Sequence, residues 1–114
     1  MRGLIRSLLN SEPDLRVIGE AKDGQEAIEL TRLLRPEVVL MNVRMPKVDG
    51  FEATQMLKEE LPTTKVLIVS AYEDLRLDSE AVRAGADGYV LKLSLVQELV
   101  DAIRGVLRGE SHYL

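Results

Sequence analysis

Short apolar runs alternate along this chain with segments whose apolar residues recur at helical spacing. Near-continuous runs at 37–43, 65–70 and 87–92 predict buried strands, and a run with mixed faces at 15–21 predicts a fourth. Helical spacing occurs at 2–11, between Gly24 and Pro36, at 51–60, at 74–84 and between Ser94 and Gly109. This alternation predicts an α/β fold with right-handed βαβ crossovers, in which helices cover both faces of a parallel sheet.

Polar residues stand at the ends of three of the predicted strands. Asn42 closes the run at 37–43, Ser70 closes the run at 65–70, and Lys92 follows Tyr89-Val90-Leu91. In an open α/β sheet, ligands bind beyond the carboxyl ends of the strands. These side chains are therefore expected to converge on one site, although they are far apart in the sequence.

Composition narrows the class of protein. With 114 residues, the chain fits one domain at 1–109, followed by a tail at 110–114 that holds the only histidine, His112, expected to be mobile. The net charge of −4 and the absence of a basic face argue against direct DNA contact. There is no cysteine, no signal-peptide pattern and no window of about 20 apolar residues, so a cytoplasmic protein without a membrane contact is expected.

Several short motifs occur in a fixed order from one end of the chain to the other. They are Ser11-Glu12-Pro13-Asp14, Gly19-Glu20-Ala21, Asp23–Ala27, Arg35-Pro36, Met45-Pro46, Asp49-Gly50, Ala84–Tyr89 and Leu91-Lys92. In this order the chain resembles the receiver domain of bacterial two-component response regulators, of the nitrate-regulator and nitrogen-fixation-regulator type. The resemblance implies a flavodoxin-like (CheY-like) fold with strand order 2-1-3-4-5.

The resemblance also implies roles for individual residues. Asn42 stands at the position of the aspartate that accepts a phosphoryl group, Ser70 and Lys92 at positions that bind phosphoryl oxygens, and Tyr89 at a switch position. An amide has no anionic oxygen to attack phosphorus, so Asn42 is not expected to form an acyl phosphate. The acidic pair that would help to bind Mg²⁺ has no match either, so the metal site is expected to be lost and no cofactor is expected.

The first strand of the receiver pattern, which is central in the sheet, also has no match. Segment 15–21 would then lack its neighbour, and an unpaired strand edge is costly. Three solutions remain: pairing of 15–21 directly with 37–43, completion of the sheet by a second copy, or a truncated or mis-started sequence. Whether Asn42 is natural or engineered stays open as well.

These features predict a degenerate receiver that is not an enzyme and acts as a phosphorylation-independent interaction or dimerisation module in transcription regulation. Its partners would be a sensor histidine kinase or an output domain and a second copy, with strand or segment exchange as one route to the homodimer. The contact surface would be the last strand with its flanking helices. One alternative is an ordinary phosphoacceptor receiver whose Asp was replaced and whose start was lost. A weaker one is a flavodoxin-like domain for a small ligand, although no Gly-rich phosphate loop follows any strand.

Overall fold

Three parallel strands form the sheet in the computed structural model, which describes residues 2–43, 47–71 and 75–112. In the described part of the chain, β1 (Val38–Asn42), β2 (Lys65–Ser70) and β3 (Gly88–Leu91) lie in the order β1-β2-β3. β1 and β2 align Val38 with Lys65, and β2 and β3 align Leu67 with Gly88. The register brings the carboxyl ends of all three strands to one edge of the sheet.

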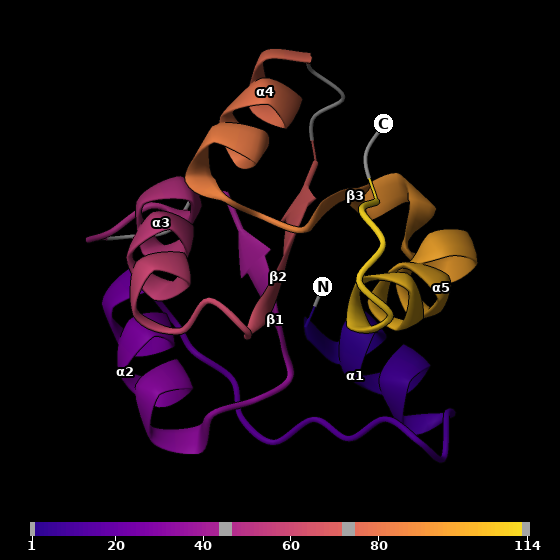
Figure 1. The fold of residues 1–114 in the computed structure, drawn as a ribbon. Helices are drawn as coiled ribbons and strands as arrows, with labels where there is room; N and C mark the ends of the chain where they lie inside the picture. The colour runs from indigo at the N-terminus through magenta and orange to yellow at the C-terminus, as the bar shows by residue number, and fades with distance from the viewer. Residues whose placement is uncertain (1, 44–46, 72–74, 113–114) are drawn as a thin grey trace.

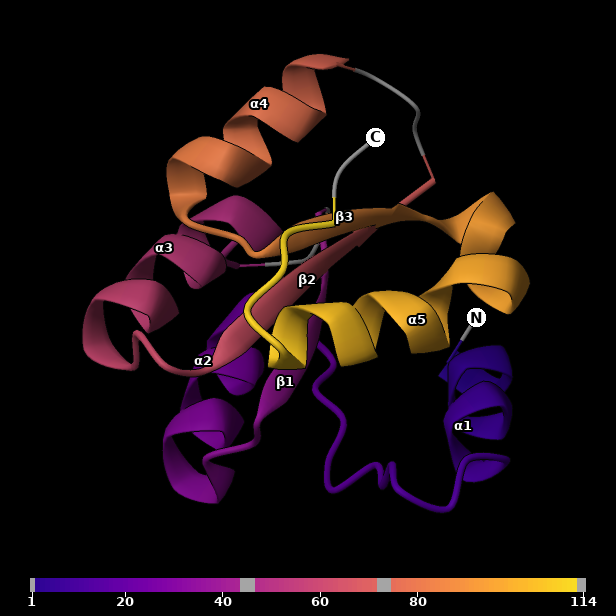
Figure 2. The ribbon, with the colours of Figure 1, turned by 45° about the vertical axis from the view of Figure 1, so that its right-hand side comes forward.

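Helices cover both faces of this sheet, as the alternating pattern predicts (Figures 1 and 2). The elements are α1 (Arg2–Asn10), α2 (Gly24–Leu34), α3 (Gly50–Glu60), α4 (Leu75–Ala84), a 3-10 turn η1 (Lys92–Ser94) and α5 (Leu95–Leu107). α1 and α5 lie on one face, and α2, α3 and α4 lie on the other. This is the arrangement of the flavodoxin-like, CheY-like receiver fold.

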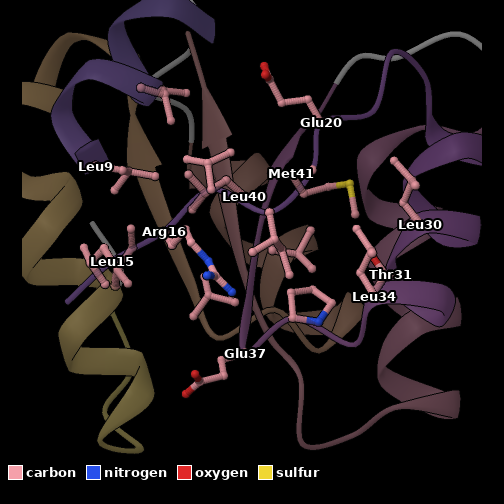
Figure 3. Close-up of a pocket in the computed structure, with 18 of the residues that line it drawn as sticks. Leu9, Leu15, Arg16, Glu20, Leu30, Thr31, Leu34, Glu37, Leu40 and Met41 are labelled. Carbon is pink, nitrogen blue, oxygen red and sulfur yellow. The ribbon is translucent and has the colours of Figure 1, made fainter. Parts of the chain in front are cut away.

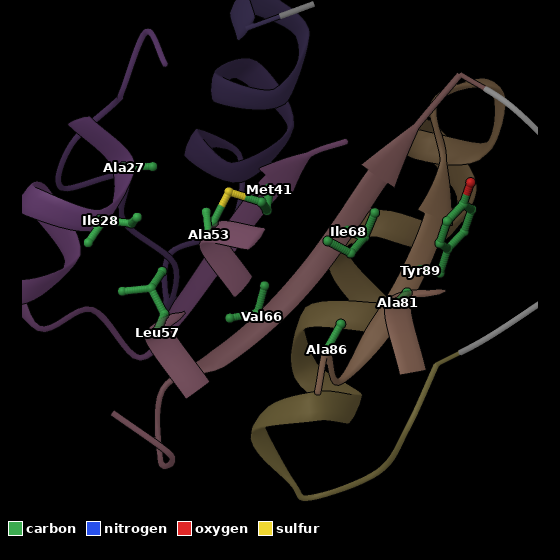
Figure 4. Close-up of a cluster of buried hydrophobic side chains, with 10 residues drawn as sticks. All are labelled: Ala27, Ile28, Met41, Ala53, Leu57, Val66, Ile68, Ala81, Ala86 and Tyr89. Atoms are coloured by element: carbon green, nitrogen blue, oxygen red, sulfur yellow. The ribbon is translucent and has the colours of Figure 1, made fainter. Parts of the chain in front are cut away.

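Two apolar clusters form the core, one on each face of the sheet. The cluster under α2, α3 and α4 consists of Ala27, Ile28, Met41, Ala53, Leu57, Val66, Ile68, Ala81, Ala86 and Tyr89 (Figure 4). The cluster under α1 and α5 consists of Leu9, Leu67, Val69, Val90, Leu95, Leu99, Ala102, Ile103 and Val106. β2 is the middle strand, and its residues alternate between the two clusters, as the period of two along a strand requires.

An ion pair and several hydrogen bonds fix the amino ends of β2 and β3. The Nζ of Lys58 lies 3.1 Å from the Oδ2 of Asp87 and donates to the carbonyl of Thr64 at 3.0 Å. The same Asp87 oxygen accepts the backbone N–H of Val66 at 2.8 Å. These groups hold α3 to the end of the sheet away from the predicted site.

The strand predicted at 15–21 does not form. Those residues belong to no helix or strand, and β1 pairs only with β2 among the described residues. Ion pairs hold both ends of the segment, with Arg104 bound to Asp14 at 2.9 Å and Arg6 bound to Glu20. Direct pairing of 15–21 with 37–43 is therefore not the way in which this sheet closes.

The tail after α5 lies against β3, whereas the sequence predicts a mobile end. His112 forms a parallel bridge with Gly88, its carbonyl accepts the N–H of Tyr89 at 2.6 Å, and its own N–H donates to the carbonyl of Asp87 at 3.2 Å. A Cβ on Gly88 would lie 2.7 Å from the His112 carbonyl oxygen, so the close approach depends on glycine. The tail thus covers the outer edge of β3.

Ending the chain at Gly109 is expected to expose the edge of β3. The N–H of Tyr89 would lose its acceptor, and each backbone hydrogen bond of this kind contributes about 1 kcal/mol. Amide hydrogen exchange should therefore be faster at Tyr89 in the shortened chain and unchanged at Ile68 in the middle strand. Equal exchange at Tyr89 in both chains would contradict a docked tail.

Candidate functional site

The polar residues predicted to form a site do meet at one edge of the sheet. Asn42 ends β1 opposite Val69, Ser70 ends β2 opposite Leu91, and Lys92 follows β3 directly. Neighbouring strands lie about 4.8 Å apart, so β1 and β3 are about 10 Å apart across β2. A lysine side chain together with a small bound anion is long enough to bridge that distance.

The three side chains have different environments at this edge. Asn42 is exposed, Ser70 is buried with 3% of its surface accessible, and Lys92 is half-buried. Lys92 forms no side-chain hydrogen bond or ion pair with the residues that the structure describes. The site therefore offers one amide, one buried hydroxyl and one ammonium group.

The end of β1 lies close against the start of α3. The N–H of Gly50 donates to the carbonyl of Val43 at 2.8 Å. A Cβ on Gly50 would lie 2.0 Å from the carbonyl oxygen of Asn42, which leaves room for glycine alone. The backbone of Asn42 is therefore fixed by the helix that follows it. Met45 and Pro46 of the receiver pattern lie outside the described residues, as do Glu73 and Asp74.

A buried carboxylate lies at the start of α2, close to Lys47. Asp23 has 5% of its surface accessible, and its Oδ1 accepts the N–H of Glu26 at 2.8 Å. The Nζ of Lys47 lies 3.5 Å from its other oxygen. The hydrogen bond from Glu26, with the nearby Lys47 charge, holds the pKa of Asp23 below its usual value of 3.8.

Tyr89, the predicted switch residue, is fully buried in β3. Its side chain packs in the cluster with Ile68, Ala81 and Ala86, on the side of the sheet that α4 covers (Figure 4). Tyr89 is thus an inward-facing core residue in this structure. A change of its rotamer would have to move α4 or expose the ring.

No group of three or more His, Cys, Asp or Glu residues with a metal-binding arrangement occurs among the described residues. The loss of the Mg²⁺ site remains a prediction from the sequence. In the same part of the chain, no helix has the length and hydropathy needed to cross a membrane.

Known proteins give the family of this chain. A family model described as the response regulator receiver domain matches residues 1–104. The chain belongs to this family.

Among curated relatives, an uncharacterized transcriptional regulatory protein of Bacillus subtilis, YxjL, is 42% identical over 93% of this chain. The response regulator VraR of Staphylococcus aureus is 38% identical over 94% of this chain. The match covers 49% of YxjL and 51% of VraR, so this receiver spans about half the length of those relatives.

Solved structures support the same assignment. A LuxR-family two-component response regulator from Aurantimonas superposes with a TM-score of 0.92 at 34% identity, over 97% of this chain and 79% of that one. The receiver domain of the putative response regulator NarL from Mycobacterium tuberculosis gives a TM-score of 0.90 at 32% identity, over 96% of this chain and 88% of that one. The receiver fold expected from the motifs is therefore confirmed.

Asp23 and Asp49, which belong to the receiver motifs, mark the starts of two helices. Each aspartate caps a helix by accepting the N–H of a glutamate three residues later, at Glu26 and Glu52. The repeated Asp-Gly-x-Glu spacing was the signal for this. Ser94 directly precedes α5 as the last residue of η1, and its side chain makes no capping hydrogen bond.

Replacing Asp23 by alanine is expected to destabilise the receiver in a pH-dependent way. Because folding lowers the pKa of this carboxyl, its contribution is present above the ordinary pKa of 3.8 and is lost as pH falls through the lower folded pKa. Urea unfolding should show a deficit for Asp23→Ala at pH 7 that shrinks toward pH 2. Asp23→Asn keeps the capping oxygen and should lose less at pH 7. A deficit for Asp23→Ala that is constant with pH would contradict this account.

Proposed function

We propose that this receiver does not accept a phosphoryl group and works as a protein-interaction module in two-component signalling and transcription regulation. The observation that carries the proposal is the position of Asn42 at the carboxyl end of β1, beside Ser70 and Lys92. Those two residues could bind an anion's oxygens, but the amide of Asn42 cannot form the acyl phosphate that a carboxylate forms. In this proposal the receiver is not an enzyme and has no resident Mg²⁺.

Partners follow from the family and are proposals for this chain. A sensor histidine kinase or an output domain would contact the receiver in the cytoplasm, and any DNA contact would belong to another domain. VraR and YxjL are described as a response regulator and a transcriptional regulatory protein, and each is about twice as long as the matched region. The net charge of −4 agrees with a receiver that leaves DNA binding to another part of the protein.

The proposed contact surface consists of α4, β3 and α5, with the turn η1. Apolar side chains are exposed on consecutive parts of it: Val82 on α4 is 55% accessible, Leu93 in η1 is 90% accessible and Val96 on α5 is 64% accessible. Large exposed apolar side chains are candidates for an interaction site. We propose that a second copy or an output domain covers them.

Size exclusion with light scattering tests this surface. Val96→Glu is expected to weaken self-association at least about tenfold, because a buried unpaired carboxylate at an interface is costly. Leu33→Glu is the matched control, since Leu33 is 76% accessible on α2 and lies outside the proposed surface. Equal association of both variants and the unchanged chain would exclude the surface. Circular dichroism on the same peaks establishes that each variant is folded.

Phosphorylation is tested by treatment with acetyl phosphate and Mg²⁺, followed by intact mass. Neither the unchanged chain nor Asn42→Asp is expected to gain a phosphoryl group, because the carboxylates needed to hold Mg²⁺ have no match in the sequence. A gain in the unchanged chain would overturn the proposal. A gain in Asn42→Asp alone would favour the alternative of an ordinary phosphoacceptor receiver in which asparagine has replaced the acceptor.

A further inference from the structure

The two outer edges of the sheet have different surroundings. Side chains of α1, α2 and residues 15–21 surround the outer edge of β1 and line a cavity of about 570 Å³, with Leu15 and Leu34 on opposite sides (Figure 3). Among the described residues, His112 alone pairs with the outer edge of β3. Figure 2 shows the tail, in yellow, running from the end of α5 to this edge. The edge of β3 is therefore the one that a second folded copy can approach.

Few contacts hold the tail on this edge. The N–H of Tyr89 donates to the carbonyl of His112 at 2.6 Å, and the N–H of His112 donates to the carbonyl of Asp87 at 3.2 Å. The ring of His112 lies 3.5 Å from a carboxylate oxygen of Glu98 on α5, at the outer limit of a hydrogen bond. Residues 110–111, which lead to this bridge, are exposed. A backbone hydrogen bond shifts an equilibrium by only about fivefold, so the tail can leave the edge at low cost.

Under the tail, β3 lacks the features that protect an exposed edge from another strand. Natural sheet edges carry charged side chains or proline for this purpose, and Gly88-Tyr89-Val90-Leu91 contains neither. Exposed apolar side chains lie at both ends of the strand, with Val82 in the last turn of α4 before it and Leu93 just after it. A two-fold axis between two copies would place β3 antiparallel to β3 and bring Leu93 of one copy toward Val82 of the other. The edge thus fits a second copy of itself.

We propose that the tail is a reversible cover of β3, and that its release lets β3 pair antiparallel with β3 of a second copy. This mechanism rests on the proposed function, in which a second copy contacts the α4–β3–α5 surface, and it adds a control of that contact. While the tail is docked, His112 occupies the outward backbone groups of Asp87 and Tyr89, so a second strand finds no partner there. Once the tail leaves, the same groups need new partners, and an added strand supplies them.

His112→Pro in the otherwise unchanged chain tests the cover. Proline has no N–H to donate to the carbonyl of Asp87, so the bridge is lost. Ser111→Ala is the matched control, because it changes an exposed side chain and leaves the backbone of the tail intact. At low protein concentration, amide exchange at Tyr89 is expected to be at least about tenfold faster in His112→Pro than in the control. Unchanged exchange at Ile68, in the middle strand, establishes that the domain is folded. Equal exchange at Tyr89 in both variants would overturn the proposal.

Light scattering over a concentration series then tests the pairing. His112→Pro is expected to dimerise at a concentration at least about tenfold lower than Ser111→Ala, because a docked tail lowers the fraction of chains that can pair. Exchange at Tyr89 should slow again as the dimer forms, since the second copy supplies the acceptor. A His112→Pro chain that stays monomeric would overturn the proposal and leave the α4–β3–α5 surface to the Val96→Glu test. A dimer in which Tyr89 still exchanges fast would show contact through side chains alone, so the surface would stand and the edge pairing would be wrong.

Discussion

Gly50→Ala is expected to destabilise the receiver by about 3 kcal/mol, in the upper part of the range for overpacked sites. The added Cβ would lie 2.0 Å from the carbonyl oxygen and 2.8 Å from the carbonyl carbon of Asn42. Both atoms are backbone, so no side chain can rotate away to make room. Relief requires the start of α3 to move off the end of β1, which also stretches the 2.8 Å hydrogen bond from Gly50 to Val43.

Urea unfolding monitored by circular dichroism measures this change, and Gly3→Ala is the matched control. Gly3 lies in α1, and a Cβ there would meet nothing within 4 Å. Alanine in an open helical position should stabilise by about 0.5–1 kcal/mol. The two glycine-to-alanine changes are thus expected to have opposite signs. A loss at Gly50 no larger than a few tenths of a kcal/mol would show that the contact between β1 and α3 is not tight in solution.

Leu57→Ala is expected to cost about 3 kcal/mol, within the 2–5 kcal/mol range for buried leucines. Leu57 has no accessible surface and lies in the cluster with Ile28, Val66 and Ala53, between α3 and the sheet (Figure 4). Truncation removes its contacts and leaves a cavity that the two flanking helices can only partly close. The effect should appear as a lower urea midpoint with an unchanged slope.

Met56→Ala is the control, because it introduces the same alanine at the neighbouring position of α3. Met56 is 40% accessible on the outer side of α3, so its truncation should shift the free energy of unfolding by about 0.5 kcal/mol or less. A similar loss at both positions would mean that α3 does not pack as described. The difference between the two variants therefore measures the packing of α3 on the sheet.

The elements of this fold could be predicted because each carries its own local signal. The apolar runs at β1, β2 and β3 and the helical stripes of α2, α3 and α5 all appear at the expected places. Period-two and period-3.6 patterns depend on neighbours within the same segment, so sequence alone determines them. The convergence of Asn42, Ser70 and Lys92 was also predictable, since parallel strands bring their carboxyl ends to one edge.

Segment 15–21 shows what the pattern alone could not determine. Its residues have the composition of a strand, but a strand forms only when a neighbouring edge offers hydrogen bonds. Here the segment lies apart from β1, and ion pairs of Asp14 with Arg104 and of Glu20 with Arg6 are found at its two ends. The partners of each pair are far apart in the sequence, so only the folded arrangement decides where the segment lies.

The position of the tail also depends on a contact between distant segments. Nothing in Glu110–His112 indicates a strand, and the tail docks because Gly88 leaves space for the His112 carbonyl at the edge of β3. The sequence by itself determined the receiver family, the helices, three strands and the residues at their ends. The tertiary structure alone decided which backbone edges are paired, because that depends on contacts between segments that the chain brings together only when it folds.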